Sequence, residues 1–257
     1  MADGPAPVSE PGLRHTEPVM GTVFSFDIRD EPTPAIRRAL AEAARLLHRV
    51  DAVFSTYRTD SAISRLGRGE LPIALCPPEV EEVLSLCAHA ARVSEGWFSI
   101  TAGGFLDPSG LVKGWSVDAA SDLLHAAGAR NTCVNGAGDL RVRGRAAPDT
   151  PWRVGIAHPL RPGHLAATAT AAEDLAVATS GTAERGAHIL HPDSGAPAQG
   201  LASLTVTGPR LALTDAYATA AFARGESALE WLETLEGYEG LAVLPEGRVR
   251  RTPGFGE

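Results

Sequence analysis

The chain contains 257 residues, of which 44% are hydrophobic and 21% charged, a balance typical of folded globular proteins and unlike that of disordered chains. Its 23 basic and 31 acidic residues give a formal net charge of -8, which disfavours nucleic acid as the main ligand because a polyanion needs a basic surface. Every apolar run is shorter than the roughly 18 residues of a membrane-spanning helix, so we expect no membrane span.

The first 17 residues are rich in proline, glycine and alanine and show no periodicity. We therefore expect residues 1–17 to be a disordered tail and residues 18–257 to form one domain. The N-terminal segment has neither the apolar stretch of a signal peptide nor a lipobox cysteine. Only three cysteines occur, without Cys-x-x-Cys spacing, which favours a cytoplasmic protein without a disulfide framework or a zinc site.

The first half of the chain is mainly helical in pattern. Residues 23–28 are a short run of strand formers, and helices are predicted from Pro34, over residues 78–93 and over residues 116–127. The last of these ends before Gly128, which suits a C-cap. The first helix is predicted from apolar residues that recur at steps of three and four: Ile36, Leu40, Ala43, Leu47 and Val50.

Strand signals gather in the second half. Residues 132–134 and 140–142 flank the turn Asn-Gly-Ala-Gly-Asp and predict a hairpin. Because strands cluster here rather than alternate with helices, we expect an α+β fold with antiparallel-rich mixed sheets flanked by helices. The further elements predicted are strands over residues 152–156, 175–179, 204–207 and 240–244, and helices over residues 215–223 and 227–235.

Two polar segments could bind an anion and a cation. Asp107 and Lys113 flank a glycine-bearing turn before a helix, where free N–H groups and an ammonium suit phosphate. The alternative is an ordinary turn with a capping side chain. Asp215 and Thr219 share one helix face and offer two hard oxygen ligands for Mg²⁺. The alternative is an acid favoured by the helix dipole and a threonine bonded to its own helix.

A third polar segment contains His188, which could accept a proton or orient a phosphate. A hydrogen-bonded structural histidine is the alternative. Ser180 lacks the Gly-x-Ser-x-Gly elbow of a serine hydrolase, and no His-Glu-x-x-His zinc motif occurs.

Taken together and in order, seven short motifs resemble those of the ApbE-like flavin transferases, or FAD:protein FMN transferases. The resemblance runs from about Glu17 to the C-terminus. The motifs are Met20-Gly21-Thr22, residues 54–57 with 60–64, Asp107-x-x-Gly110-x-x-Lys113-Gly114, residues 134–139, residues 178–181 with Glu184-Arg185, His188-Ile189 with Pro192 and residues 195–197, and Asp215 with Thr219.

The resemblance implies a T-fold-related domain and a specific chemistry. Members use FAD as substrate with Mg²⁺ or Mn²⁺ and transfer its FMN half to a Thr or Ser hydroxyl of an acceptor flavoprotein, while AMP leaves. The acceptors carry the target threonine in a short motif, and they include respiratory and electron-transfer subunits. Neither the identity of the acceptor nor the oligomeric state follows from this chain.

The resemblance also implies residue roles. Lys113 would lie near phosphate, and His188 would deprotonate or orient the acceptor hydroxyl, with Asp215 as the second catalytic residue. Gly110, through its carbonyl, would hold the metal together with Asp215 and Thr219. The residues expected to bind FAD are Met20, Tyr57, Phe98, Asp107, Lys113 and Ile189.

Two departures from the family pattern leave other functions open. The segment Trp97-Phe98-Ser99 lacks the acid that usually follows the phenylalanine, and His191 replaces the usual aspartate before Pro192. The alternatives are an FAD-binding protein without transfer activity, an Mg²⁺-dependent FAD pyrophosphatase that yields FMN and AMP, and a structural α+β domain.

Overall fold

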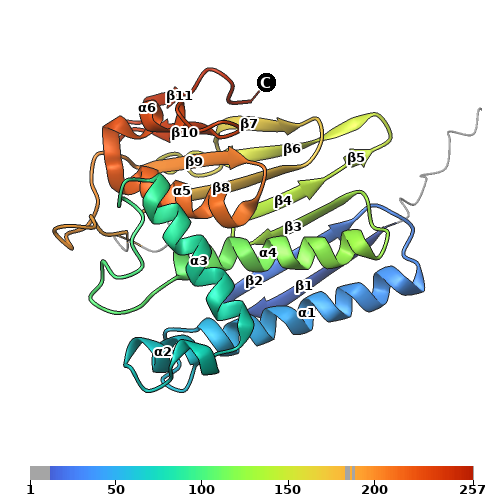
Figure 1. The fold of residues 1–257 in the computed structure, drawn as a ribbon. Helices are drawn as coiled ribbons and strands as arrows, with labels where there is room; N and C mark the ends of the chain where they lie inside the picture. Colours follow the sequence, from blue (N-terminus) through green and yellow to red (C-terminus); the bar gives the residue numbers. More distant parts are fainter. Residues whose placement is uncertain (1–11, 183–185, 187–188, 257) are drawn as a thin grey trace, which may run out of the picture.

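A computed structural model describes residues 12–182, 186 and 189–256. Within these residues, eight strands form one sheet in the order β1-β2-β3-β4-β8-β9-β10-β11, and β5, β6 and β7 form a second sheet (Figure 1). Neighbouring strands are antiparallel throughout. The strands are β1 (Leu13–Val19), β2 (Thr22–Ile28), β3 (Thr132–Gly136), β4 (Asp139–Arg143), β5 (Arg145–Ala147), β6 (Thr150–Ala157), β7 (Leu165–Ala171), β8 (Leu175–Gly181), β9 (Ser203–Gly208), β10 (Glu239–Val243) and β11 (Val249–Arg251).

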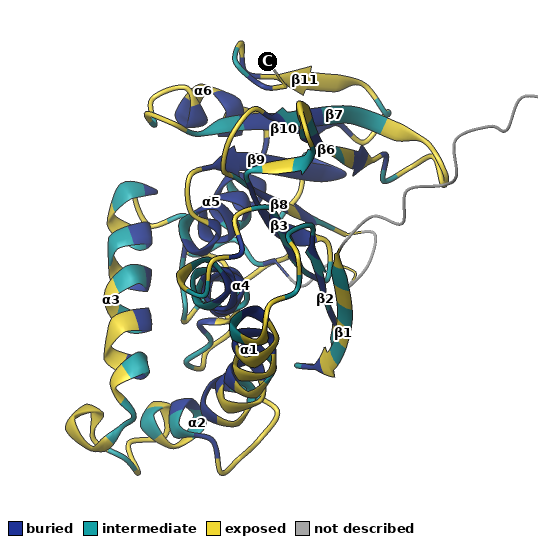
Figure 2. Ribbon diagram, turned by 90° about the vertical axis from the view of Figure 1, so that its right-hand side faces the viewer, coloured by how far each residue is buried: buried dark blue, intermediate teal, exposed yellow. Residues whose placement is uncertain are grey.

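Helices cover one face of the large sheet. In Figure 2, α4 and α5 lie next to the strands, and α3 lies outside them. The helices are α1 (Pro34–Phe54), α2 (Ala62–Gly67), α3 (Pro78–Val93), α4 (Ser109–Ala126), α5 (Leu211–Arg224) and α6 (Ala228–Leu232), with short 3₁₀ turns η1 (Ile73–Leu75) and η2 (Gly225–Ser227). No helix in the described part of the chain is both long and apolar enough to cross a membrane.

Two apolar clusters hold these layers together. The larger fills the space between the large sheet and the helices and includes Phe24, Leu111 and Leu204, all fully buried. The smaller lies on the opposite side of the large sheet, where Val142 and Leu241 pack with Trp152 of β6. The α+β fold with antiparallel sheets flanked by helices is therefore confirmed.

Most predicted elements are confirmed, but three helix boundaries were wrong. The helix over residues 78–93 is α3, and the hairpin around residues 135–139 is β3–β4. However, α4 begins at Ser109 rather than residue 116, and α5 begins at Leu211 rather than residue 215. The glycines in the first turns of α4 suggested a loop, yet they lie at a helix contact. The last predicted helix is shorter, since α6 ends at Leu232.

The prediction of a tail to residue 17 was too long, because β1 begins at Leu13. Residues 1–11 lie outside the described part of the chain. A two-residue turn at Met20 (φ 56°) and Gly21 (φ 68°) joins β1 to β2, with positive φ at both positions as in the tight turns typical of hairpins. Strand pairing thus orders a segment whose own sequence carries only a weak signal.

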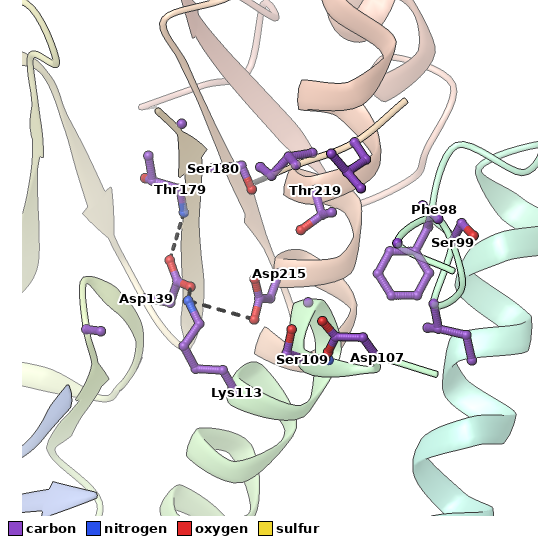
Figure 3. Close-up of a pocket in the computed structure, with 18 of the residues that line it drawn as sticks. Phe98, Ser99, Asp107, Ser109, Lys113, Asp139, Thr179, Ser180, Asp215 and Thr219 are labelled. Carbon is purple, nitrogen blue, oxygen red and sulfur yellow. Dashed lines mark hydrogen bonds and ion pairs between the residues drawn. The ribbon is translucent and has the colours of Figure 1, made fainter. Parts of the chain in front are cut away.

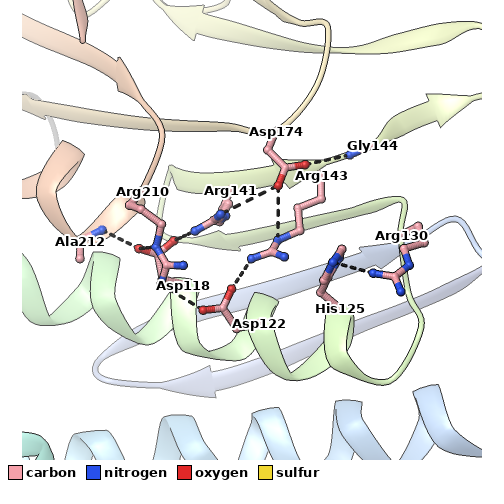
Figure 4. Close-up of polar contacts among 10 residues, drawn as sticks. All are labelled: Asp118, Asp122, His125, Arg130, Arg141, Arg143, Gly144, Asp174, Arg210 and Ala212. Atoms are coloured by element: carbon pink, nitrogen blue, oxygen red, sulfur yellow. Dashed lines mark hydrogen bonds and ion pairs between the residues drawn. The ribbon is translucent and has the colours of Figure 1, made fainter. Parts of the chain in front are cut away.

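A ladder of charged pairs joins α4 to β4. Residues 139, 141 and 143 share one face of β4 because strand side chains alternate. Arg141 pairs with Asp118, and Arg143 pairs with Asp122 (Figure 4). The buried Asp118 carboxylate also accepts a hydrogen bond from the main-chain N–H of Ala212, at 3.0 Å. This network therefore fixes the start of α5 against α4.

A carboxylate clamp joins β1 to α1. Glu17 accepts hydrogen bonds from His15 at 2.9 Å and His48 at 2.8 Å, and these bonds hold the pKa of the Glu17 carboxyl below its ordinary range. A lowered folded-state pKa adds stability above the unfolded pKa, and that stability is lost as the pH falls through the folded value.

We therefore expect Glu17→Gln to lower the urea unfolding midpoint at about pH 6 and to lower it less at about pH 3, below the ordinary glutamate pKa, where part of this stabilisation is already lost. Glu42→Gln, which removes an exposed acid from the middle of α1, is the control and should leave the midpoint unchanged at both pH values. An equal loss for Glu17→Gln at both pH values would contradict the clamp.

Candidate active site

A cavity of about 620 Å³ lies at the end of the large sheet, bordered by α4, α5, the β3–β4 turn and the ends of β8 and β9 (Figure 3). This volume is in the range of small-molecule and cofactor sites. Polar side chains converge on it from segments far apart in the sequence: Asp107, Ser109, Lys113, Asp139, Thr179, Ser180, Asp215 and Thr219.

The close approach of α4 and α5 forms the floor of the cavity. A Cβ atom added to Gly114 would lie 2.4 Å from the carbonyl oxygen of Leu211 and 3.0 Å from Cβ of Asp215. One turn earlier, a Cβ on Gly110 would lie 3.3 Å from Oγ1 of Thr219. The two glycines therefore let the α4 backbone lie directly against the side chains of Asp215 and Thr219.

Asp215 is fixed by α4 rather than by its own helix. Its Oδ2 accepts a hydrogen bond from the main-chain N–H of Gly114 at 3.2 Å, and Asp215 is only 5% exposed. It is also the fifth residue of α5, beyond the first turn where a helix dipole favours an acid. The alternative of a simple dipole-stabilising acid therefore does not account for its position.

The donors around Asp215 suit a hard divalent cation. Asp215 and Thr219 lie on the same side of α5 and face the cavity, next to the Gly110 backbone (Figure 3). A carboxylate, a hydroxyl and a main-chain carbonyl are oxygen ligands of the kind that Mg²⁺ takes, with water and substrate phosphate completing its shell. Among the residues that the structure describes, no group of three or more His, Cys, Asp or Glu is placed to hold a metal.

A cation of the protein itself lies beside these donors. The Lys113 ammonium forms an ion pair with Asp139 and lies 4.0 Å from Oδ2 of Asp215. Asp139 also accepts a hydrogen bond from the main-chain N–H of Thr179 at 2.8 Å. The cavity thus combines a fixed positive charge with the carboxylate of Asp215, which can bind an anion and a cation side by side.

Asp107 lies at the cavity and also accepts a hydrogen bond at the start of α4, so its role in binding FAD stays a prediction. It lines the cavity, and its Oδ1 accepts a hydrogen bond from the main-chain N–H of Ser109 at 3.0 Å, as a residue at a helix start does. Its charge also contributes to raising the pKa of the buried Cys87 thiol to about 12, after burial itself. Burial likewise raises the pKa of Cys133 to about 12, so both thiols stay protonated at neutral pH.

The remaining residues predicted to bind FAD fall into two groups. Phe98 and Ile189, both under one tenth exposed, line the cavity together with Tyr57, whose side chain is 98% exposed. Met20 is not among the lining residues. Its turn lies at the same end of the sheet as the β3–β4 turn, because Phe24 pairs with Gly136.

The predicted base lies outside the described residues, since His188 belongs to the segment whose placement is not described. Directly after this segment, Leu190 forms an isolated β-bridge with Pro197. The catalytic role of His188 therefore stays a prediction.

Asp139 is a site residue that sequence reasoning missed. Residues 134–139 were interpreted as a hairpin turn and as a family motif, and no role was given to Asp139; the turn itself is present, with positive φ at Ala137 (54°) and Gly138 (93°). The sequence feature that could have identified it is an aspartate directly after the turn, at the first position of β4. Its partner Lys113 is 26 residues away in the chain, so only the packing of α4 on β4 brings them together.

We expect Gly114→Ala to lower the free energy of unfolding by about 1–3 kcal/mol, because its Cβ would overlap the Leu211 carbonyl. Alanine ordinarily stabilises a helix by up to about 1 kcal/mol relative to glycine, so a loss must come from this contact. Gly110→Ala is the matched control and should be close to neutral, since its nearest neighbour is a side-chain hydroxyl. Urea unfolding measures both. An unchanged or more stable Gly114→Ala would contradict the tight contact.

Comparison with known proteins identifies the family of this chain. The sequence model of the ApbE family matches residues 20–106 and 103–242. Proteins named FAD:protein FMN transferase from Vibrio cholerae serotype O1 and Haemophilus influenzae are each 26% identical. The first alignment covers 81% of this chain and 80% of the relative, and the second covers 83% and 81%.

Among solved structures, the flavin transferase ApbE from Vibrio cholerae superimposes with a TM-score of 0.80 at 22% identity. The match covers 94% of this chain and 97% of that one, and so shows the fold. With a family match that spans most of the chain and a fold that agrees with it, this chain belongs to the ApbE family.

Proposed function

We propose that this protein is an Mg²⁺-dependent FAD:protein FMN transferase, which moves the FMN half of FAD to a Thr or Ser hydroxyl of an acceptor protein and releases AMP. The names of its relatives support the activity. The observation that carries the proposal is the convergence of Asp215, Thr219 and the Gly110 backbone beside Lys113 in one cavity.

The reaction is a phosphoryl transfer. The acceptor hydroxyl oxygen forms a bond to the phosphorus of the FMN half, the bond from that phosphorus to the AMP oxygen breaks, and the hydroxyl proton passes to a base. Asp215, Thr219 and the Gly110 carbonyl would hold the divalent cation. When bound, such an ion neutralises charge on the diphosphate and on the leaving group.

The residues of the chain contribute binding and orientation. The Lys113 ammonium offers a compact charge for a phosphate oxygen. Phe98 and Ile189 give the cavity an apolar wall suited to a flat ring system, and Tyr57 at its exposed rim can pack on the same ligand. His188 is proposed as the group that receives or orients the hydroxyl proton.

The direct test mixes the protein with FAD, Mg²⁺ and an acceptor domain that carries the family's target threonine. We expect flavin fluorescence on the acceptor band after denaturing electrophoresis and one AMP released per flavin attached. The same acceptor with valine at the target position is the control and should stay dark. Release of FMN and AMP without an acceptor would instead indicate a pyrophosphatase, and binding of FAD without any product would indicate a binding protein.

Asp215→Asn tests the cation site within this proposal. The amide oxygen can still accept the hydrogen bond from Gly114, so the fold should persist while the charged ligand is lost. We expect transfer at limiting Mg²⁺ to fall by at least about tenfold, since even indirect partners of metal ligands are worth roughly 10–100-fold. Glu42→Gln removes an exposed acid of α1 that does not line this cavity and should keep normal transfer. Full activity of Asp215→Asn at limiting Mg²⁺ would exclude Asp215 as a ligand.

A further inference from the structure

The charged ladder between α4 and β4 reverses its sign at the cavity. In the two pairs away from the site, the helix supplies the acid and the strand supplies the base: Asp118 with Arg141, and Asp122 with Arg143. At the cavity the helix supplies Lys113 and the strand supplies Asp139. The reversal places an ammonium, rather than another carboxylate, next to Asp215.

Asp139 is built as a fixed anchor. Its side chain is 2% exposed, and each of its oxygens has a separate partner. Oδ1 accepts a hydrogen bond from the Thr179 main chain of β8 at 2.8 Å, and Oδ2 faces the Lys113 ammonium. The β8 backbone thus fixes the orientation of a carboxylate whose remaining oxygen holds the lysine.

Lys113 lies between the carboxylates of Asp139 and Asp215, for which we infer different roles. It pairs with Asp139, and its Nζ also lies 4.0 Å from Oδ2 of Asp215, the proposed cation ligand. An ammonium and a divalent cation at one carboxylate repel each other and compete for it. The position of Lys113 therefore influences how readily Asp215 binds a cation.

We propose that Asp139 is a positioning residue that keeps the Lys113 ammonium in contact with its own carboxylate and 4.0 Å from Asp215, so that Asp215 can bind the divalent cation and the ammonium can bind the FAD diphosphate. The inference rests on the proposed function, because it takes Asp215 as the cation ligand. Asp139 itself touches neither cation nor substrate in this account. Without the negative charge of Asp139, the ammonium would move closer to Asp215 and compete more strongly with the cation.

The test is a double-mutant cycle on cation binding in the absence of FAD, with Mn²⁺ as the probe and free Mn²⁺ measured by electron paramagnetic resonance. Asp139→Asn retains an acceptor for the Thr179 N–H and should weaken Mn²⁺ affinity by about tenfold, the size of other indirect metal-site effects. Lys113→Met should strengthen Mn²⁺ affinity, since it removes the competing charge. In the Lys113→Met background, Asp139→Asn should change the affinity by less than about twofold, because contacting residues give non-additive effects.

Thermal unfolding checks that each variant is folded, and Asp122→Asn is the control for loss of an acid from the same ladder. An Asp139→Asn effect that is equally large with and without Lys113 would overturn the inference, since Asp139 would then act by its own charge. If Asp139→Asn does not fold, an unchanged or weaker Mn²⁺ affinity of Lys113→Met would overturn it. If the unmodified protein binds Mn²⁺ but Asp139→Asn has no effect, this inference fails and the proposed function stands. If it binds no Mn²⁺ without FAD, this inference fails, and the transfer assay alone decides the proposed function.

Discussion

The contact between α4 and α5 is the constraint on which the site depends. Gly110 and Gly114 lie one turn apart on α4 and present bare backbone to α5. Because no side chain intervenes, the main chain of one helix reaches the Asp215 and Thr219 side chains of the other. Leucine or valine at either position would push the helices apart and move Asp215 and Thr219 away from the α4 backbone.

Charge is arranged around this contact in a definite order. Ion pairs along α4 and β4 hold the helix on the sheet, and Asp118 also binds the start of α5. At the cavity end, Asp139, Lys113 and Asp215 follow one another as acid, base and acid. A dinucleotide diphosphate with a divalent cation matches such an arrangement, since each ionic group finds a partner of opposite sign.

The sequence predicted the parts of this structure that depend on local pattern. The helix over residues 78–93 and the hairpin around residues 135–139 follow from periodicity and turn residues, and both are present. The start of α4 was missed because Gly110 and Gly114 are poor helix formers whose purpose is contact with another helix. Asp139 was missed because its partners, Lys113 and Thr179, lie on α4 and β8 and meet it only in the folded protein. The resemblance gave roles to further cavity residues such as Asp215 and Thr219, for which the local pattern left two interpretations open, but Met20, to which it also gave a role, does not line the cavity.

The central claim is that the α4–α5 contact binds a divalent cation against the diphosphate of FAD. A crystal structure of the protein soaked with FAD and Mg²⁺ measures this directly. Our account predicts the cation on the Asp215 carboxylate and the Thr219 hydroxyl, with a phosphate oxygen beside the Lys113 ammonium. A well-ordered FAD whose diphosphate lies away from α5, with no ion at Asp215, would contradict it.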